Sequence, residues 1–399
     1  MTPEPQTSQD TPAAPREAPE IIILGAGPVG MTLALALSRG GRRVALVDKA
    51  PRGSYGGDPR ALALSHGARQ LLGQLDAWNT AAATPIEEIH VSQRGGFGRT
   101  LMHARDYGLP ALGYVLRYGA VAQALDARLD TAPGLSLWHG HQVTRVEAQD
   151  GAMTVQLTGP TGNTILRAPL LVHGEGTPYD DPEVPVREYG QQALLAEVRI
   201  EGSHGGRAWE RFTPGGPLAL LPLEDGFAIV FTVREKEADS LLALDDTAFL
   251  AVLQERFGQR HRFTAVGPRS HFPLALRVRP TLVRGREVWV GNSAQTLHPV
   301  SGQGFNLGLR DAWELARRLN AGRPGDDPGE AGRLAAYAAG RRADRQGGAL
   351  FTDTIVRLFS NDQPGLRLIR GLGLTALDLF PGARHFVAKR MIWGARAWP

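Results

Sequence analysis

One short segment near the start of the chain limits the fold more than any other. A buried-strand run, Ile21–Leu24, leads directly into a glycine-rich turn, a helical pattern and a second apolar run that ends on Asp48. In such a turn Gly25 makes the bend, Gly27 lets a pyrophosphate approach the backbone, and Gly30 packs the helix on the strand. The acid 18 residues after the last glycine has the position of a ribose ligand. The pattern predicts a dinucleotide-binding βαβ unit; a Rossmann-like unit that binds nothing is the alternative.

A second glycine-rich turn lies late in the chain, at Gln295–Arg310. An apolar strand pattern, Val288–Asn292, precedes it, and a helical pattern, Asp311–Leu319, follows it. Gly302 and Gly304 allow the backbone to come close to a ligand. The following helix would direct its free N–H groups and positive dipole end at that ligand. We expect a flat cofactor ring to lie over this turn; an ordinary strand–helix connection is the alternative.

Composition excludes several classes of protein. The chain has 399 residues, of which 42% are hydrophobic, so it is globular and long enough for two or three domains. Cysteine is absent, which excludes disulfides and thiolate metal sites. The net charge is only +4, and we expect no nucleic-acid partner. We also expect no metal, because His261, His271 and His298 lack a regular ligand spacing.

The ends of the chain differ from its centre. Residues 1–19 are rich in Pro, Thr, Ala and Glu and are expected to form a disordered tail. They lack the apolar core of a signal peptide, and no segment reaches the ~18 apolar residues of a membrane span. We therefore expect a cytoplasmic protein.

Strand patterns dominate the middle of the chain. Arg211–Pro222 and Gly226–Val233 are expected to be neighbouring antiparallel strands, and Asp246–Phe257 a helix inserted after them. The run Leu135–Arg145 is expected to be a strand, and residues 86–105 form strands around a Gly-Gly pair. This region is expected to be a second domain, inserted into the nucleotide-binding one.

Three separated blocks carry a resemblance to a known family. The chain resembles the class A flavoprotein aromatic hydroxylases at Gly25–Gly30, Leu170–Gly176 and Gly291–Gly304. Within that family, three further segments are similar to the ubiquinone-biosynthesis hydroxylases: Asp58–Ser65, Tyr189–Leu194 and Arg211–Pro214. Two segments are most like the 2-octaprenyl-6-methoxyphenol hydroxylases: His90–Gly95 and Gly291–Pro299.

The resemblance implies a fold class and a division into domains. The expected class is α/β: a Rossmann-like FAD-binding domain, an inserted antiparallel β-sheet substrate domain and C-terminal helices. The FAD-binding domain is expected in residues 20–85, 113–178 and 284–345, the substrate domain in 86–112 and 179–283, and the helical region in 346–399.

The resemblance also implies an activity. FAD, NAD(P)H and O2 are the expected cofactors, and the expected reaction is hydroxylation of the ring of a polyprenylated phenol in ubiquinone biosynthesis. NAD(P)H is expected to bind transiently, since no second glycine fingerprint follows a strand. A flavin-dependent reductase or oxidase of a lipid, a soluble phenol hydroxylase and a non-catalytic assembly factor that keeps FAD remain alternatives.

Site residues follow from the motifs. His298 lies in the flavin loop and is the first candidate for a base that deprotonates the phenol; a structural histidine is the alternative. Tyr189 and Gln192 are weaker candidates for lining the ring pocket. Arg60 could contact a phosphate or the flavin edge, or be a surface arginine. The expected cofactor-binding residues are Gly25, Gly27, Gly30, Asp48, Arg60, Glu175, Gly291, Asn292, Pro299, Gly302, Gly304 and Asn306.

Three positions depart from the wider family. Asn292 stands where an aspartate usually binds the ribityl chain, and an amide can still accept a hydrogen bond there. Gln295 replaces a frequent histidine, and Glu175 replaces an aspartate, which keeps the charge but adds a methylene.

The C-terminal stretch, residues 350–399, combines arginines with aromatic side chains. Arg384, Lys389 and Arg390 are interleaved with Phe386 and Trp393. A basic helix with aromatics can lie on an anionic membrane surface, so we expect peripheral attachment to the inner face of the plasma membrane. A helix that packs over a domain seam is the alternative. Other proteins of ubiquinone biosynthesis are further expected partners.

Overall fold

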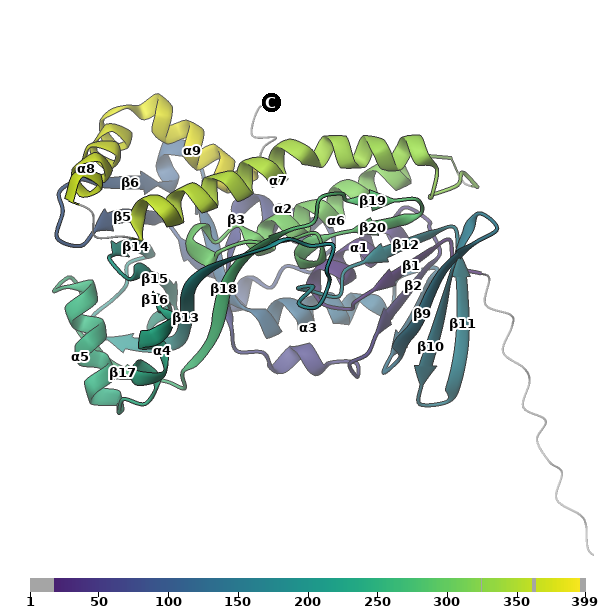
Figure 1. The fold of residues 1–399 in the computed structure, drawn as a ribbon, viewed down its shortest axis with the longest axis horizontal. Coiled ribbons are helices and arrows are strands. Elements are labelled where there is room, and N and C mark those ends of the chain that lie inside the picture. The colour runs from purple at the N-terminus through teal and green to yellow at the C-terminus, as the bar shows by residue number, and fades with distance from the viewer. Residues whose placement is uncertain (1–17, 324, 361–363, 395–399) are drawn as a thin grey trace, which may run out of the picture.

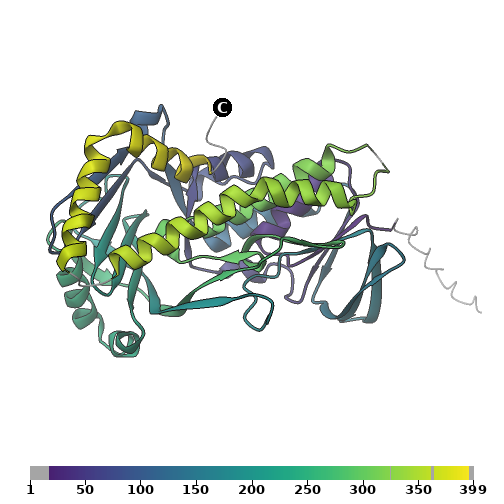
Figure 2. The same ribbon diagram turned by 45° about the horizontal axis from the view of Figure 1, so that its top comes forward.

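The computed structural model describes residues 18–323, 325–360 and 364–394. A mainly parallel sheet lies at one end of the molecule and a large, mainly antiparallel sheet at the other (Figure 1). The long helix α7 (Ala331–Phe359) spans the distance between them, and Figure 2 shows it crossing the molecule from one end to the other. This is the expected α/β class. The expected tail of residues 1–19 lies almost entirely outside the described residues.

The parallel sheet forms around the first strand. Its order is β19-β20-β12-β1-β2-β8, and all neighbours are parallel except the β19–β20 pair. The run Ile21–Leu24 is fully apolar because layers cover both faces of the sheet. The strands are β1 (Ile21–Leu24), β2 (Val44–Asp48), β8 (Leu135–His139), β12 (Leu170–His173), β19 (Val283–Arg284) and β20 (Glu287–Trp289).

Helices cover one face of this sheet and a small antiparallel sheet covers the other. Ile21 and Ile23 pack with the helices, whereas Ile22 and Leu24 pack against the small sheet. The helices are α1 (Pro28–Arg39), α3 (Tyr118–Leu129) and α6 (Gly304–Asn320). The small sheet consists of β9 (Gln142–Gln149), β10 (Ala152–Gly159) and β11 (Gly162–Ala168).

The large sheet has nine strands in the order β21-β18-β13-β16-β15-β14-β5-β6, with β17 paired to β13. Helices α4 (Glu235–Leu242) and α5 (Asp246–Phe257) cover one of its faces. The strands are β5 (Glu88–Gln93), β6 (Arg99–His103), β13 (Val186–Ile200), β14 (Arg207–Thr213), β15 (Gly216–Leu223), β16 (Gly226–Arg234), β17 (Phe263–Val266), β18 (Ser270–Val278) and β21 (Gln295–Thr296).

Further elements join the two ends. A three-stranded sheet of β3 (Ala61–Ser65), β7 (Gly113–Arg117) and β4 (Thr84–Ile86) packs against the large sheet through one apolar cluster. Helix α8 (Pro364–Leu379) runs beside β6, and α9 (Pro381–Trp393) packs next to α2 (His66–Gln74). None of the described helices is long and apolar enough to cross a membrane.

Three element boundaries differ from the sequence predictions. Helix α6 begins at Gly304 and not at Asp311, so the glycine turn runs straight into the helix. The stretch Arg211–Pro222 is a hairpin, β14 and β15, joined at Pro214 and Gly215. The run Leu135–Arg145 is split between two sheets, because Gly140 turns the chain with a φ of +69°.

Candidate functional site

The first glycine turn lies at the carboxyl end of β1. A Cβ on Gly25 would lie 2.4 Å from the carbonyl oxygen of Gly174, and one on Gly30 would lie 1.9 Å from that of Gly25. These two glycines are required by packing alone. A Cβ on Gly27 would meet only the hydroxyl of Tyr118, at 3.3 Å. The turn is therefore open at Gly27, where helix α1 begins with no side-chain cap and its free N–H groups can face a phosphate.

Asp48, at the end of β2, is tied to this turn. Its carboxylate accepts hydrogen bonds from the backbone N–H of Ala26 at 2.6 Å, the N–H of Ala50 at 2.8 Å and the hydroxyl of Tyr55 at 3.0 Å. An ionised carboxylate has about four acceptor positions, so one is left for a ribose hydroxyl. The ribose contact of Asp48 stays a prediction, and its position beside the glycine turn agrees with it.

Aromatic side chains line the mouth of the turn. The guanidinium of Arg60 lies 4.9 Å from the ring centroid of Tyr118, and it also pairs with Asp58. The ring of Phe305 lies 6.3 Å from that of Tyr118. Arg60 is thus held over the ring that borders Gly27, and its contact with the cofactor remains a prediction. Tyr118 could not be singled out in the sequence, because its helix α3 carries no recognisable motif.

Strand β12 ends on a clamped histidine. The ring of His173 stacks on Trp289 at 4.8 Å, and its two nitrogens lie 3.1 Å from Glu175 and 3.0 Å from Glu287. Burial lowers the pKa of His173, but the two carboxylates outweigh it and raise the pKa above its ordinary value. The carboxylate of Glu175 is thus paired with the histidine two residues before it.

The late strand ends on a buried charge network. Gly291, with a φ of +62°, donates its N–H to Asp311 at 3.1 Å, while Asn292 is exposed and lies 3.5 Å from the hydroxyl of Thr177. Gln295 donates to Asp311 at 2.6 Å and accepts from Arg345 at 2.6 Å. The glutamine amide thus joins an anion to a cation, because its N–H donates to the carboxylate while its oxygen accepts from the guanidinium.

The second glycine turn is fixed to β3. After the 3-10 turn Pro299–Ser301, Gly302 takes a φ of +59° and Gly304 opens helix α6 with no atom in the way of a Cβ. The amide of Asn306 accepts from the N–H of Ser65 at 2.8 Å and donates to the carbonyls of Ala63 and Gly302. The side chain of Asn306 therefore holds the turn in place, and the backbone at Pro299, Gly302 and Gly304 is left to face a ligand.

His298 is buried, with 1% of its surface exposed. Its Nδ1 accepts a hydrogen bond from the N–H of Val300 at 3.1 Å, so in the neutral ring the proton is on Nε2. Burial lowers the pKa of His298 to about 3. The Nε2 atom is buried and has no partner among the described residues. This geometry makes His298 a hydrogen-bond donor to a ligand and argues against the predicted role as a base.

Of the two predicted ring-pocket residues, the structure brings only Tyr189 to His298. The two rings lie edge to face at 5.4 Å, and the Tyr189 hydroxyl donates to Asp353 of α7 at 3.2 Å. Gln192 instead contacts His271 on the other face of β13. After a β-bulge between Glu188 and Gln191 the strand alternates regularly, so Gln191 faces the side opposite to Gln192, where its amide donates to the carbonyl of Gly215 at 2.8 Å.

One face of the large sheet points toward the second glycine turn; we call it the inner face. Phe212 of this face packs with Val300, and Glu197 accepts from Arg117 of β7 at 2.8 Å. Its central apolar residues are only half-buried, whereas their neighbours on the opposite face are fully buried. This is the pattern of a surface that is open to a ligand. The half-buried residues are Leu195, Ala219, Leu221 and Val230.

The inner face carries one carboxyl group that the sequence did not single out. Glu210 lies two residues before Phe212 on β14, so both side chains are on the same face. Its Oε1 is buried without a partner among the described residues, and burial raises the pKa of Glu210 to about 8. A carboxyl with such a pKa can hold or take up a proton near neutral pH.

The chain thus offers a place for FAD. Gly27 leaves space at an uncapped helix N-terminus, Asp48 keeps an acceptor, and His298 has a free buried donor. These groups match a pyrophosphate, a ribose and a polar ring edge. No group of three or more His, Asp or Glu side chains in the described part of the chain could hold a metal ion.

Comparison with known proteins supports this assignment. The model of the FAD binding domain family matches residues 18–347. A ubiquinone hydroxylase, UbiL, of Rhodospirillum rubrum is 36% identical over 387 residues, covering 93% of this chain and 89% of the relative. The 3-demethoxyubiquinol 3-hydroxylase of Escherichia coli is 29% identical over 372 residues, covering 90% and 94%.

A solved structure shows the same fold. The p-nitrophenol 4-monooxygenase PnpA of Pseudomonas putida superposes with a TM-score of 0.75 at 18% identity, covering 95% of this chain and 99% of that one. The flavin-dependent brominase Bmp2 has a TM-score of 0.73, covering 95% and 94%, so the fold alone does not fix the reaction. On the evidence of the family match and of the ubiquinone hydroxylase sequence, the chain belongs to the class A flavoprotein hydroxylases, in the group that contains the ubiquinone hydroxylases.

Proposed function

We propose that this protein is an FAD-dependent monooxygenase of ubiquinone biosynthesis, which hydroxylates the ring of a polyprenylated phenol with NAD(P)H and O2. The observation that carries the proposal is the half-buried apolar inner face, which lies opposite the second glycine turn and carries Glu210, a carboxyl group whose buried Oε1 has no partner among the described residues. Likeness to relatives named ubiquinone hydroxylases supports the same reaction class.

His298 and Glu210 have different roles in the proposed reaction. Bound FAD supplies the hydride acceptor and the activation of O2. His298 would donate from Nε2 to a ligand over the turn, and Tyr189 and Val300 hold its ring in place. Glu210 would accept the phenol proton, because a phenolate is the better nucleophile. The apolar residues around Glu210 exclude water, which would otherwise compete for the same proton.

The substrate tail fits the lining of the inner face. Leu195, Ala219, Leu221 and Val230 offer apolar surface in the centre of the sheet. Each CH2 of a prenyl tail that is buried contributes about 0.8 kcal/mol, so a short tail already dominates binding over the polar head. This argues for a lipid substrate over a small soluble phenol.

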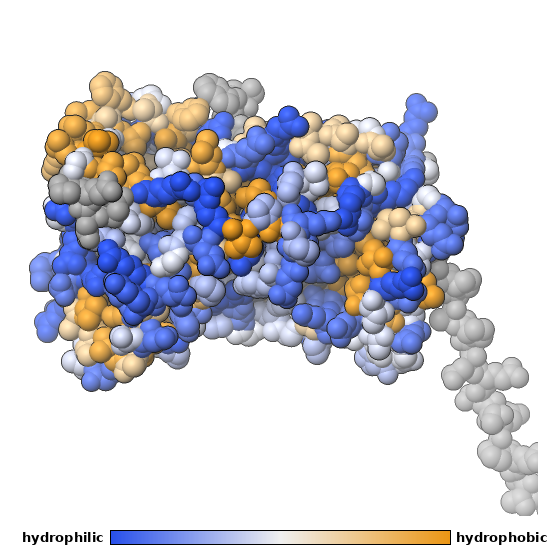
Figure 3. Space-filling model, viewed as in Figure 1, coloured by the Kyte–Doolittle hydropathy of each residue, from blue (hydrophilic) through white to orange (hydrophobic). Residues whose placement is uncertain are grey.

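A lipid substrate requires access to a membrane, and we include an anionic membrane surface among the partners. Large apolar side chains are exposed along α8 and α9, and Figure 3 shows hydrophobic residues gathered at that end of the molecule. The three basic residues predicted to contact the membrane differ in their surroundings. Arg384 turns inward and donates to the carbonyl of Asp378 at 2.7 Å, while Lys389 is exposed and Arg390 lies 5.2 Å from the ring of Phe386.

The test is turnover with isotopically heavy O2. We expect one heavy oxygen atom in the ring of a prenylated phenol, and far poorer turnover of the same phenol without its tail. Reduction or oxidation of the lipid without oxygen insertion would identify a reductase or oxidase. Failure of NAD(P)H to bleach the flavin in the presence of any substrate would favour an assembly factor, and equal turnover of both phenols would favour a soluble phenol hydroxylase.

A further inference from the structure

A pocket of about 470 Å³ lies on the other face of the large sheet, away from the second glycine turn. Strand register puts Arg99 of β6 directly opposite Ser92 of β5, and Ser92 beside Arg211 of β14. Side chains that face each other across neighbouring strands share one face, so the two arginines flank the serine hydroxyl. Arg260, which follows α5, enters from the side and lies 5.5 Å from the ring of Trp209.

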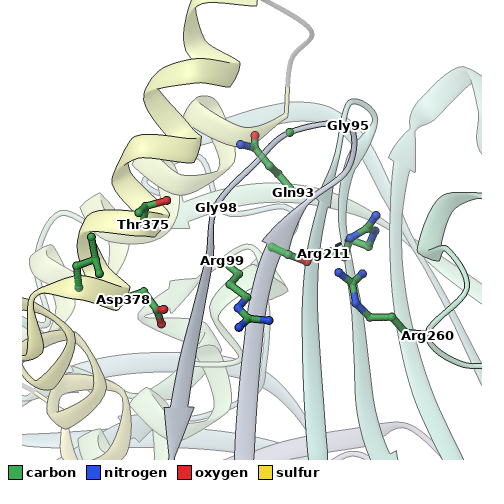
Figure 4. Close-up of a pocket in the computed structure, with 11 residues that line it drawn as sticks. Gln93, Gly95, Gly98, Arg99, Arg211, Arg260, Thr375 and Asp378 are labelled. Carbon is green, nitrogen blue, oxygen red and sulfur yellow. Dashed lines mark hydrogen bonds between the residues drawn. The ribbon is translucent and has the colours of Figure 1, made fainter.

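The pocket carries an excess of positive charge. Arg99, Arg211 and Arg260 form no ion pair with any described carboxylate, and Arg211 makes only a 3.3 Å hydrogen bond to Ser92. Figure 4 shows the guanidinium groups of Arg211 and Arg260 close together. Burial, and then the charge of Arg260, lower the pKa of Arg211. Such a cluster is stable only with an anion or with water between the charges.

Among the described residues that line the pocket, Asp378 is the one carboxylate, and it already has partners outside the arginine cluster. Asp378 of α8 accepts from the N–H of Leu101 at 3.0 Å and lies 3.9 Å from Arg384. The Nε of Arg211 is buried and has no acceptor among the described residues. Guanidinium groups and a hydroxyl that converge in this way match the oxygens of a phosphate.

An apolar stripe leads away from the pocket along α8. Leu368, Leu372, Thr375 and Leu379 follow at spacings of four, three and four residues, which places them on one face of the helix. Thr375 and Leu379 line the pocket, and the three leucines are between 55% and 69% exposed. Phe97, at the tip of the β5–β6 hairpin, packs beside Gly371 and extends the stripe.

From these two features we propose that the pocket of Arg99, Arg211 and Arg260 binds the phosphate headgroup of an anionic phospholipid, whose acyl chains lie along the stripe of α8. A soluble phosphate ester would not explain an exposed apolar stripe that begins at the pocket. The inference rests on the proposed function, since it gives the membrane partner a defined site, and it orients the protein with α8 toward the bilayer.

The experiment measures binding of the holoenzyme to vesicles without substrate, so that it does not depend on the hydroxylase activity. We expect flotation with phosphatidylcholine vesicles that contain phosphatidylglycerol, and much weaker flotation with phosphatidylcholine alone. A surface cation contributes about 1 kcal/mol to such binding, so Arg99→Gln and Arg260→Gln should each weaken it roughly fivefold. Arg145→Gln, at an exposed pair with Glu147 on β9, is the matched control and should have no effect.

Two outcomes would overturn the proposal. Equal flotation of the wild-type protein and of a variant that combines Arg99→Gln with Arg260→Gln would exclude the pocket as the lipid site. Competition by inorganic phosphate at concentrations too low to act by ionic strength would indicate a site for a soluble phosphate. Turnover of a short-tailed phenol in detergent should be the same in the wild-type protein and in both arginine variants. If the wild-type protein does not turn over this phenol at all, the result argues against the proposed function and not against the lipid site.

Discussion

At the residue scale, burial makes a carboxyl group, and not a histidine, the candidate base of this site. Histidine is the usual general base near neutral pH, and His298 was the natural candidate in the sequence. Burial favours the neutral form of any group, so it lowers the pKa of His298 to about 3 and raises that of Glu210 to about 8. The carboxyl is therefore the group that titrates near physiological pH. Neither shift could be predicted, because burial depends on strands far apart in the chain.

The first prediction concerns Glu210→Gln. The amide keeps the shape but cannot accept a proton, so turnover should fall by roughly 10²–10⁴-fold. In the wild-type protein kcat/KM should rise with pH through about 8, as Glu210 ionises, and the variant should lose this step. The measurement is a pH profile of both proteins with a prenylated phenol. Glu201→Gln, at an exposed position paired with Arg262, is the control. An unchanged profile in the Glu210 variant would remove it from the mechanism.

Stability should change in the opposite direction. The pKa of Glu210 is raised to about 8 in the folded protein. Between about pH 4.5 and 8 the carboxyl therefore ionises in the unfolded chain but stays protonated in the folded one, so the free energy of unfolding falls as the pH rises. Glu210→Gln should therefore increase the free energy of unfolding at pH 8, by on the order of 1–3 kcal/mol, and have little effect below pH 4.5. The measurement is urea unfolding at pH 8 and at a pH below 4.5. A variant whose fold is damaged would instead have a lower free energy of unfolding at both pH values.

At the element scale, the two glycines of the first turn allow a matched pair of variants. Gly27→Val brings a side chain against the hydroxyl end of the Tyr118 side chain, which has to move only slightly, so the protein should fold and lose FAD. Gly30→Val would drive a side chain into the carbonyl of Gly25 and should prevent folding of the βαβ unit. Flavin absorbance and circular dichroism distinguish the two results. A folded Gly27→Val protein with full flavin occupancy would contradict the cofactor assignment.

Local patterns explain which elements could be predicted. The βαβ unit and α5 follow from periodicity and from turn residues within one segment, and both were predicted closely. The network of Asp311, Gln295 and Arg345 could not be predicted, because an aspartate in a helical pattern normally faces water. Here it is fully buried, and it accepts hydrogen bonds from Gln295 of the late loop and from Arg341 of α7. The bulge in β13 likewise has no signal beyond Gly190.

At the scale of the whole molecule, function depends on faces that only the assembled sheet defines. The inner face combines strands from residues 88 to 234, and the arginine pocket joins β6, β5 and β14 through their register. The sequence motifs predicted FAD at the two glycine-rich turns. They could not place Arg99 beside Arg211, because no local pattern specifies which strands pair in a sheet of this size.

The number of dinucleotide-type glycine turns in the described residues predicts how the electron donor NAD(P)H binds. Within the described residues, the parallel sheet has one glycine turn of the dinucleotide type, at β1, and the FAD assignment uses it. NAD(P)H is then left with surface contacts, so it should bind weakly and leave after hydride transfer. We expect FAD to co-elute with the protein in gel filtration while NAD(P)H separates, and the rate of flavin reduction to saturate only at high nucleotide concentration. A stoichiometric NAD(P)H complex that survives the column would mean that a second nucleotide site exists, built from residues that no glycine turn marks.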